Sequence, residues 1–299
     1  MHDRPKPFEI KQEAVGSVDG MSLEEACQHI WDLDANRLIP EKDYDINVQE
    51  GKKPYWKEDK ANEPFFASVD KNVFQRPTYK TFVALLDNYE SQVGIEEVFS
   101  NEERQEVNAF LDAILQTAPM QFCHKYCRAK NSDFVPESLS GFRTLLFKIW
   151  FELYHRSRGG RADSSGFEHV FTGEIKDDKI SGFHNWLQFY LEEQKGKVNY
   201  KGYLKPKSNS DAETNDDDHI LTLQFEWGGV EKFAGTCFIG VSPEFEMALY
   251  TVCFLCGEED NEITLDTGVD VFGLNIRCYK MAGDKIGTCF PETTSHHED

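Results

Sequence analysis

The stretch Val269-Asp270-Val271-Phe272-Gly273-Leu274-Asn275-Ile276 largely alternates apolar and polar side chains, the period-two pattern of a β-strand with one buried face. Residues 220–225, ILTLQF, form a second strand-like run. Residues 279–290 are typical of a hairpin that turns at Ala282-Gly283-Asp284. We therefore expect β-sheets in the C-terminal half of the chain.

Helical spacing dominates the N-terminal half. Ser22 and Glu25 form a capping box before a helix expected to end near Leu38, and Ser100 with Glu103 forms a second box. The pattern predicts further helices at residues 78–89, 142–154 and 183–193, and one that begins at Ser242-Pro243. Most of the expected helices thus lie in the N-terminal half of the chain, and the expected strands lie in the C-terminal half.

The expected fold class is α+β, with a helical N-terminal lobe and a mixed α/β C-terminal lobe that holds antiparallel sheets. The segment RSRGGRADSSG, residues 156–166, has the composition of a boundary, which gives lobes at 22–157 and 158–292. We also expect tails at residues 1–21 and 293–299, a segment without regular secondary structure at residues 39–77 and a solvated acidic connector at residues 208–218.

Composition indicates a globular protein: of 299 residues, 39% are hydrophobic and 13% aromatic. The eight cysteines lie mostly in apolar stretches and are expected to be buried free thiols, including Cys253-x-x-Cys256, which lacks a second pair for zinc. We find no apolar run long enough to span a membrane and no apolar core of a signal peptide. A cytoplasmic or nuclear location is favoured, and secretion stays open if a leader has been removed.

The net charge of −21 argues against a nucleic-acid partner on bulk electrostatics. Binding of RNA would therefore need a local basic surface. The candidates are Lys195, Lys197, Lys201, Lys205 and Lys207, with Arg156, Arg158 and Arg161 upstream. The alternative is that these side chains form an ordinary solvated face.

Two histidines stand in distinctive settings, His169 in GFEHVF and His184 in GFHNW. His169 has a strand-like frame, whereas His184 opens an expected helix, whose N-terminus disfavours a positive charge on the ring. Cleavage of RNA through its own 2′-hydroxyl needs a base, an acid and a fixed cation near the phosphate. Lys232, just before an expected strand, could supply the cation. Taken singly, such a histidine is more often a structural residue, and such a lysine is more often a surface residue.

Longer strings resemble the EndoU family of poly(U)-specific endoribonucleases. They are GFEHVFTGE (166–174), FHNWLQFYLEE (183–193), NYKGYL (199–204), FIGVSPEFEMALYTVCFL (238–255) and KIGTCF (285–290), with IWDLDANRL, EKDYD and LLDNYE in the N-terminal half. They occur in order from about residue 22 to residue 290.

The resemblance implies a uridylate-specific endoribonuclease that cuts single-stranded RNA and leaves 2′,3′-cyclic phosphate and 5′-hydroxyl ends. It implies that His184 is the base, His169 the acid and Lys232 the catalytic cation. Glu168 and Glu174 match acidic positions required for activity, and Thr288 matches a threonine near the uridine pocket. Phe290, where relatives often have tyrosine, and Thr236 complete the candidate substrate-binding residues.

The resemblance also implies activation by a divalent metal, Mn²⁺ or Ca²⁺, for which the sequence indicates no site. Single-stranded, uridine-containing RNA is the expected partner, with no membrane and a monomeric state. Two alternatives remain. One is an RNA-binding protein of the same fold with weak or no turnover. The other is a metal-dependent phosphodiesterase that uses the acidic residues around Glu174 and needs no 2′-hydroxyl.

Overall fold

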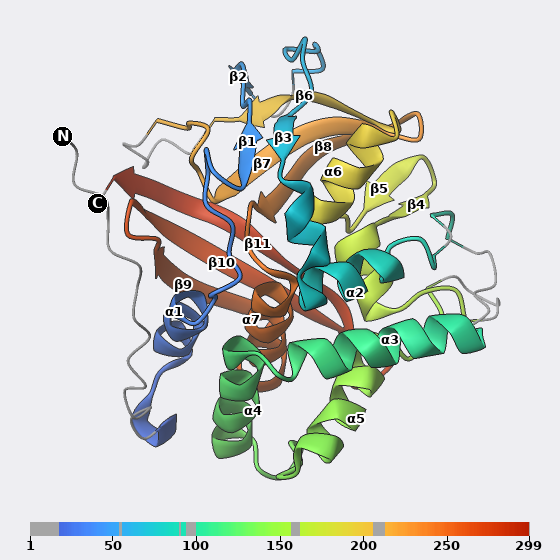
Figure 1. The fold of residues 1–299 in the computed structure, drawn as a ribbon, viewed down its shortest axis with the longest axis vertical. Helices are drawn as coiled ribbons and strands as arrows, with labels where there is room; N and C mark the ends of the chain where they lie inside the picture. The colour runs from blue at the N-terminus through green and yellow to red at the C-terminus, as the bar shows by residue number, and fades with distance from the viewer. Residues whose placement is uncertain are drawn as a thin grey trace.

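A computed structural model describes residues 18–53, 56–89, 91–93, 100–156, 162–205 and 213–298. Helices α3, α4 and α5 lie together at one end of the molecule, and the sheet that contains β6, β7 and β8 lies at the other (Figure 1). Helix α7 and the long strands β10 and β11 lie between them (Figure 1). The mixed α+β class expected from the sequence is confirmed.

The α-helices are α1 (Leu23–Asp32), α2 (Pro77–Leu85), α3 (Asn101–Ile114), α4 (Ala118–Lys130), α5 (Leu139–Trp150), α6 (Trp186–Gln194) and α7 (Pro243–Cys256). Short helical turns are η1 (Val18–Gly20), η2 (Lys71–Gln75) and the π-helix η3 (Glu168–Thr172). Both expected capping boxes are present, because Ser22 and Ser100 each accept from the backbone of the glutamate three residues on.

The strands form four sheets. The strands are β1 (Tyr44–Ile46), β2 (Gly51–Lys52), β3 (Phe66–Val69), β4 (Glu174–Lys176), β5 (Lys179–Ser181), β6 (Val198–Leu204), β7 (Ile220–Trp227), β8 (Val230–Phe238), β9 (Asp260–Asp266), β10 (Asp270–Met281) and β11 (Lys285–Glu298). One sheet has the order β2-β6-β7-β8, in which only the β2–β6 pair is parallel, and an antiparallel sheet has the order β11-β10-β9. Pairs β1–β3 and β4–β5 are separate antiparallel ribbons.

Helix α7 is the centre of the core. All of its residues from 243 to 255 are buried, and it contacts α1, α2, α4, β10 and β11. A helix that is buried on every side is stable only when other elements surround it. Helices from the N-terminal half and strands from the C-terminal half therefore bury one continuous core, while the expected lobe boundary near residue 157 stays a prediction.

Several expectations differ from the structure, among them the end of the first helix, which is Asp32 rather than a residue near Leu38. Residues 39–77 are not merely irregular, because they contain β1, β2, β3 and η2, and the buried Phe65 and Phe66 in this segment pack against Phe189. Residues 293–299 were expected to be a tail, but β11 continues to Glu298 and buries His296. The end of the expected acidic connector is also folded, because Asp218 is only 1% exposed.

The cysteines are free, and all except the partly buried Cys256 are buried, as their apolar settings predicted. Among the described residues, no helix is both long and apolar enough to cross a membrane.

Candidate active site

His169 lies on a π-helix rather than in the strand-like frame expected from its neighbours. Ser165 and Glu168 start this turn with reciprocal hydrogen bonds between side chain and backbone, at 3.2 and 3.3 Å. Phe167, Val170 and Phe171 are fully buried because they face aromatic side chains of the helical core. Glu168 thus supports the turn that carries His169.

The imidazole of His169 is held by Glu174. Its Nδ1 contacts Glu174 Oε2, and Arg156 Nε lies 3.2 Å from the same oxygen. Burial raises the pKa of Glu174, but His169 and Arg156 outweigh burial and lower this pKa overall, so the group is a carboxylate. A carboxylate acceptor places the proton of the neutral ring on Nδ1, which leaves Nε2 to exchange a proton with a substrate.

Burial lowers the pKa of His169 below its ordinary value, while Glu174 acts in the opposite direction. Of the two site histidines, His169 is the one with an anionic partner at Nδ1. It is therefore the better candidate for carrying the extra proton.

A tight turn at Gly182 joins the two histidines. Gly182 has φ +68°, and a Cβ atom there would lie 1.6 Å from the carbonyl oxygen of His169. That carbonyl oxygen accepts from the backbone of Phe183, and Val170 accepts from the backbone of His184 at 2.9 Å. Only glycine permits this approach, which sets His184 beside the π-helix.

His184 does not open the helix as expected, because Asn185 is the N-cap of α6. Its Nδ1 donates to the carbonyl oxygen of Thr236 at 3.0 Å, which leaves Nε2 as an acceptor. Burial, followed by the positive charge of Lys232, places the pKa of His184 well below its ordinary value. A neutral imidazole with a free acceptor nitrogen has the properties of a general base.

Lys232 lies inside β8, not before a strand, and is 8% exposed. Its Nζ donates to the carbonyl oxygen of Gly182 at 2.7 Å. Burial lowers the pKa of Lys232 to about 8, so the amine remains mainly protonated at neutral pH. The charge of Lys232 lowers the pKa of both His169 and His184, which indicates that the three groups share one site.

Strand β11 forms a wall of this site. The ring of Phe290 stacks on His184 with centroids 4.6 Å apart. Thr288 is two residues away on the same strand, so its side chain faces the same side. Thr236 contributes its carbonyl oxygen to His184, while its hydroxyl pairs with that of Thr222.

Arg156 connects the site to β11. The sequence analysis named Arg156 only as a member of a basic cluster and did not predict this role. Besides Glu174, it donates to the carbonyl oxygen of Gly287 and to the hydroxyls of Tyr154 and Ser164. The only other signal in the sequence was its position a few residues after the aromatic helix α5.

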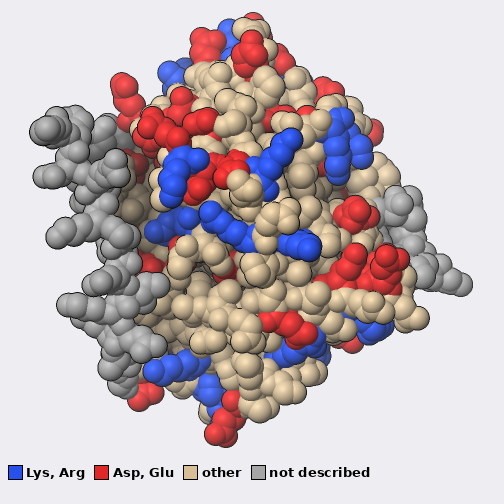
Figure 2. Space-filling view, in the orientation of Figure 1, with Lys and Arg blue, Asp and Glu red and all other residues tan. Residues whose placement is uncertain are grey.

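The described members of the expected basic cluster are largely paired with carboxylates. Lys195 bonds Glu192 at 2.9 Å, and Lys201 lies 3.3 and 3.6 Å from Glu226 and Glu231. Lysine and arginine side chains lie beside acidic ones on the face drawn in Figure 2. Arg158, Arg161 and Lys207 lie outside the described residues. The described lysines favour the solvated-face alternative.

Comparison with known proteins identifies a family that matches most of the chain. Residues 22–291 match the sequence profile of the family "Endoribonuclease XendoU". This chain belongs to the XendoU endoribonuclease family. It is 42% identical over 275 residues to "Uridylate-specific endoribonuclease B" of Danio rerio, covering 90% of this chain and 95% of the relative.

Other members of the XendoU family give the same result. The chain is 44% identical over 277 residues to "Poly(U)-specific endoribonuclease-A" of Xenopus laevis, covering 90% of this chain and 92% of the relative. A solved structure described as "The structure of XendoU: a splicing independent snoRNA processing endoribonuclease" superposes with a TM-score of 0.77 at 39% identity, covering 91% of this chain and 97% of the other. All the site residues described above lie within the part that matches the XendoU family.

Proposed function

We propose that this chain is a uridylate-specific endoribonuclease that cleaves single-stranded RNA by attack of the 2′-hydroxyl on the adjacent phosphorus. The observation that carries the proposal is that two imidazoles with different hydrogen-bond partners lie beside one buried cation. His184 is held by a carbonyl oxygen and His169 by a carboxylate, and Lys232 lies with them. Membership in the XendoU family supports the same reaction.

In the proposed reaction, Nε2 of His184 accepts the proton of the 2′-hydroxyl as the oxygen attacks phosphorus. His169, protonated when the phosphate is bound, donates a proton from Nε2 to the departing 5′-oxygen. The products are a 2′,3′-cyclic phosphate and a 5′-hydroxyl. Lys232 stabilises the negative charge on the non-bridging oxygens, an effect worth about 10²–10³ in kcat for a comparable donor.

Glu168 and Glu174 support His169 in this proposal, the first by starting its helical turn and the second by orienting its ring. Thr288 is proposed to contact the uracil edge, and Phe290 to stack on the nucleotide where it now stacks on His184. Thr236 acts through its carbonyl oxygen, which fixes the tautomer of His184. Activation by Mn²⁺ or Ca²⁺ is proposed from the resemblance, and the carboxylates nearest the reaction do not suit a metal, because Glu174 is paired with His169 and Arg156.

The test uses two oligoribonucleotides that differ at one position, a single uridine in one and 2′-deoxyuridine in the other, each with EDTA, Mn²⁺ or Ca²⁺. His184→Ala tests the base, and His155→Ala, which removes an exposed histidine, is the control. We expect cleavage only after the uridine, with a cyclic phosphate end, in the wild type and the control but not in His184→Ala.

Other outcomes separate the alternatives. Cleavage of both oligonucleotides would overturn the proposal in favour of metal-activated water, because that reaction needs no 2′-hydroxyl. Binding without cleavage under every ion condition would point to an RNA-binding protein of this fold.

A further inference from the structure

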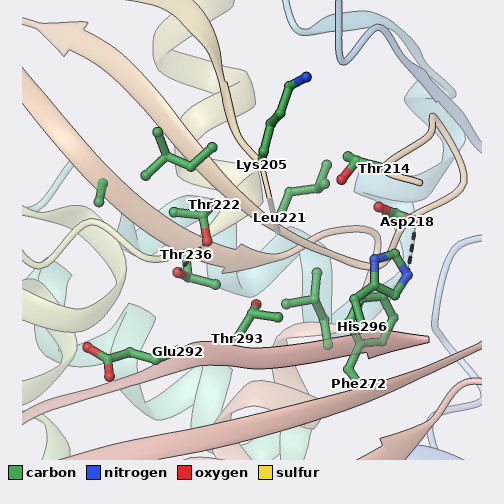
Figure 3. Close-up of a pocket in the computed structure, with 13 residues that line it drawn as sticks. Lys205, Thr214, Asp218, Leu221, Thr222, Thr236, Phe272, Glu292, Thr293 and His296 are labelled. Atoms are coloured by element: carbon green, nitrogen blue, oxygen red, sulfur yellow. Dashed lines mark hydrogen bonds and ion pairs between the residues drawn. The ribbon is translucent and has the colours of Figure 1, made fainter. Parts of the chain in front are cut away.

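A cavity of about 290 Å³ lies between the β6–β8 strands and the β10–β11 pair. Thr236, whose carbonyl oxygen holds His184, lines one side of it, and His296 lines another. Figure 3 shows Asp218 and His296 pointing toward each other, with Thr222 and Thr236 further along the cavity. The cavity thus adjoins the active site but contains a second group of ionisable side chains.

Asp218, Asp270 and His296 form this group. Their exposed fractions are 1%, 5% and 2%. One donor atom from each lies within 4.8 Å of the others, and Nε2 of His296 is 3.2 Å from Asp270 and 3.8 Å from Asp218. Donors bound at 2.0–2.2 Å to a shared ion lie roughly 3–3.6 Å apart, so these side chains need only small movements to bind one.

The carboxylate of Asp218 is a second observation in favour of a bound cation, independent of the cluster geometry. Among the described residues, neither of its buried carboxylate oxygens has a hydrogen-bond partner. A buried carboxylate whose oxygens lack hydrogen bonds is costly next to a second buried carboxylate, that of Asp270, and a divalent cation would compensate both charges.

The donor set discriminates among ions. One imidazole nitrogen with two carboxylates suits Mn²⁺ or a similar transition metal, whereas Ca²⁺ prefers six to eight oxygen ligands. His296 is oriented by stacking on Phe272, with ring centroids 4.2 Å apart. The adjoining cavity offers space for the water molecules that would complete the coordination of Mn²⁺.

We propose that Asp218, Asp270 and His296 bind a Mn²⁺-class divalent cation that fastens the end of β11 to the starts of β7 and β10. Asp218 lies two residues before β7, Asp270 is the first residue of β10, and His296 is near the end of β11. The same β11 strand carries Phe290, which stacks on His184. The ion would therefore position a wall of the active site without contacting the reacting atoms.

The test measures binding rather than activity, so it does not depend on the proposed nuclease reaction. Purified full-length protein is treated with EDTA and dialysed. Mn²⁺ is then titrated, with free Mn²⁺ followed by electron paramagnetic resonance and the unfolding midpoint by thermal scanning. We expect saturable binding of one ion, a rise in midpoint, and weaker binding of Ca²⁺ than of Mn²⁺.

Asp218→Asn is the decisive variant, because it keeps the shape of the side chain and removes the charge. It should weaken Mn²⁺ binding at least tenfold and abolish the rise in midpoint, yet be no less stable than wild type without metal. His296→Gln should weaken binding similarly. Glu262→Gln, an exposed position on neighbouring β9, is the control and should behave as wild type.

Two results would overturn the proposal. One is wild-type protein that binds no Mn²⁺, and the other is an Asp218→Asn variant that binds Mn²⁺ as tightly as wild type. A metal-free Asp218→Asn protein that is less stable while Mn²⁺ binding is unchanged would assign the cluster to a purely structural ion pair. Tighter binding of Ca²⁺ than of Mn²⁺ would overturn the assignment of the ion.

Discussion

At the scale of single residues, Gly182 determines whether the site can form. Its positive φ turns the chain between the histidines, its carbonyl oxygen holds Lys232, and the carbonyl oxygen of His169 occupies the space a Cβ atom would need. The chain also offers a matched comparison in Gly196, which has the same φ of +68° but no neighbouring atom within 4 Å of the place a Cβ atom would take.

We predict that Gly196→Ala lowers the free energy of unfolding by about 1–2 kcal/mol, the cost of a left-handed backbone alone. Gly182→Ala should cost roughly 2 kcal/mol more, because the steric overlap adds to that strain, and should also reduce cleavage of uridine-containing RNA. Urea denaturation and initial cleavage rates check both variants. Equal losses of stability in the two variants would contradict a steric role for the space beside Gly182.

At the scale of elements, the junction of α6 and α7 holds the segment that follows His184. Asn185 caps α6 by accepting from the backbone of Gln188 at 3.0 Å, and its side-chain nitrogen donates to Glu246 of α7 at 2.7 Å. Burial raises the pKa of Glu246 to about 8, against the opposing hydrogen bonds from Asn185 and Tyr250. The carboxyl group is therefore mainly protonated in the folded protein at neutral pH.

This shift destabilises the fold as pH rises. A carboxyl group with a pKa of 4.5 when unfolded and about 8 when folded must take up a proton on folding between these values. Its contribution to stability is fully present below pH 4.5 and is lost as pH rises through 8. We predict that Glu246→Gln, which needs no proton, increases the free energy of unfolding at pH 7 by on the order of 3 kcal/mol.

Urea denaturation at several pH values tests the effect of Glu246→Gln. The gain in stability should disappear near pH 4.5, which serves as the internal control. A variant less stable than wild type at pH 7 would mean that the two hydrogen bonds require a carboxylate.

The sequence predicts elements well where local chemistry decides them. The helix starts at Ser22, Ser100 and Ser242 follow from side-chain caps, and the turn of the last hairpin follows from Ala282-Gly283-Asp284. These signals depend only on neighbouring residues. Packing between residues that are far apart in the sequence has no comparable local signal.

Three misread positions illustrate this limit. His169 looks strand-like because its apolar neighbours are contiguous, yet they are buried against helices that come earlier in the chain. His296 and Asp218 sit in polar stretches that resemble solvated ends, and only the pairing of β10 with β11 and the packing beside β7 bury them. Local sequence made His184 and Lys232 candidates only, and their assignment to the site rested on the resemblance.

At the scale of the whole molecule, an RNA substrate must approach a protein with a net charge of −21. The described lysines Lys195 and Lys201 are paired with glutamates, and Lys232 is the buried cation of the site. These three side chains therefore offer little charge for neutralising the phosphates of a bound RNA. We therefore expect recognition to depend mainly on the reacting phosphate and on the proposed contacts of the base with Thr288 and Phe290.

We predict that RNA binding depends only weakly on salt. For single-stranded RNA the slope of log affinity against log salt is about −0.7 for each neutralised phosphate, so two or three contacts give a slope near −2. The affinity of His184→Ala for a uridine oligonucleotide, measured from 50 to 200 mM NaCl at constant divalent ion, should fall by less than about twentyfold. Lys201→Gln should leave this slope unchanged, because Lys201 already has carboxylate partners.

A slope of about −4 or steeper would instead require a row of cationic side chains along the bound RNA. Because the described lysines of the basic cluster are largely paired, Arg158, Arg161 and Lys207 would then be the first residues to replace.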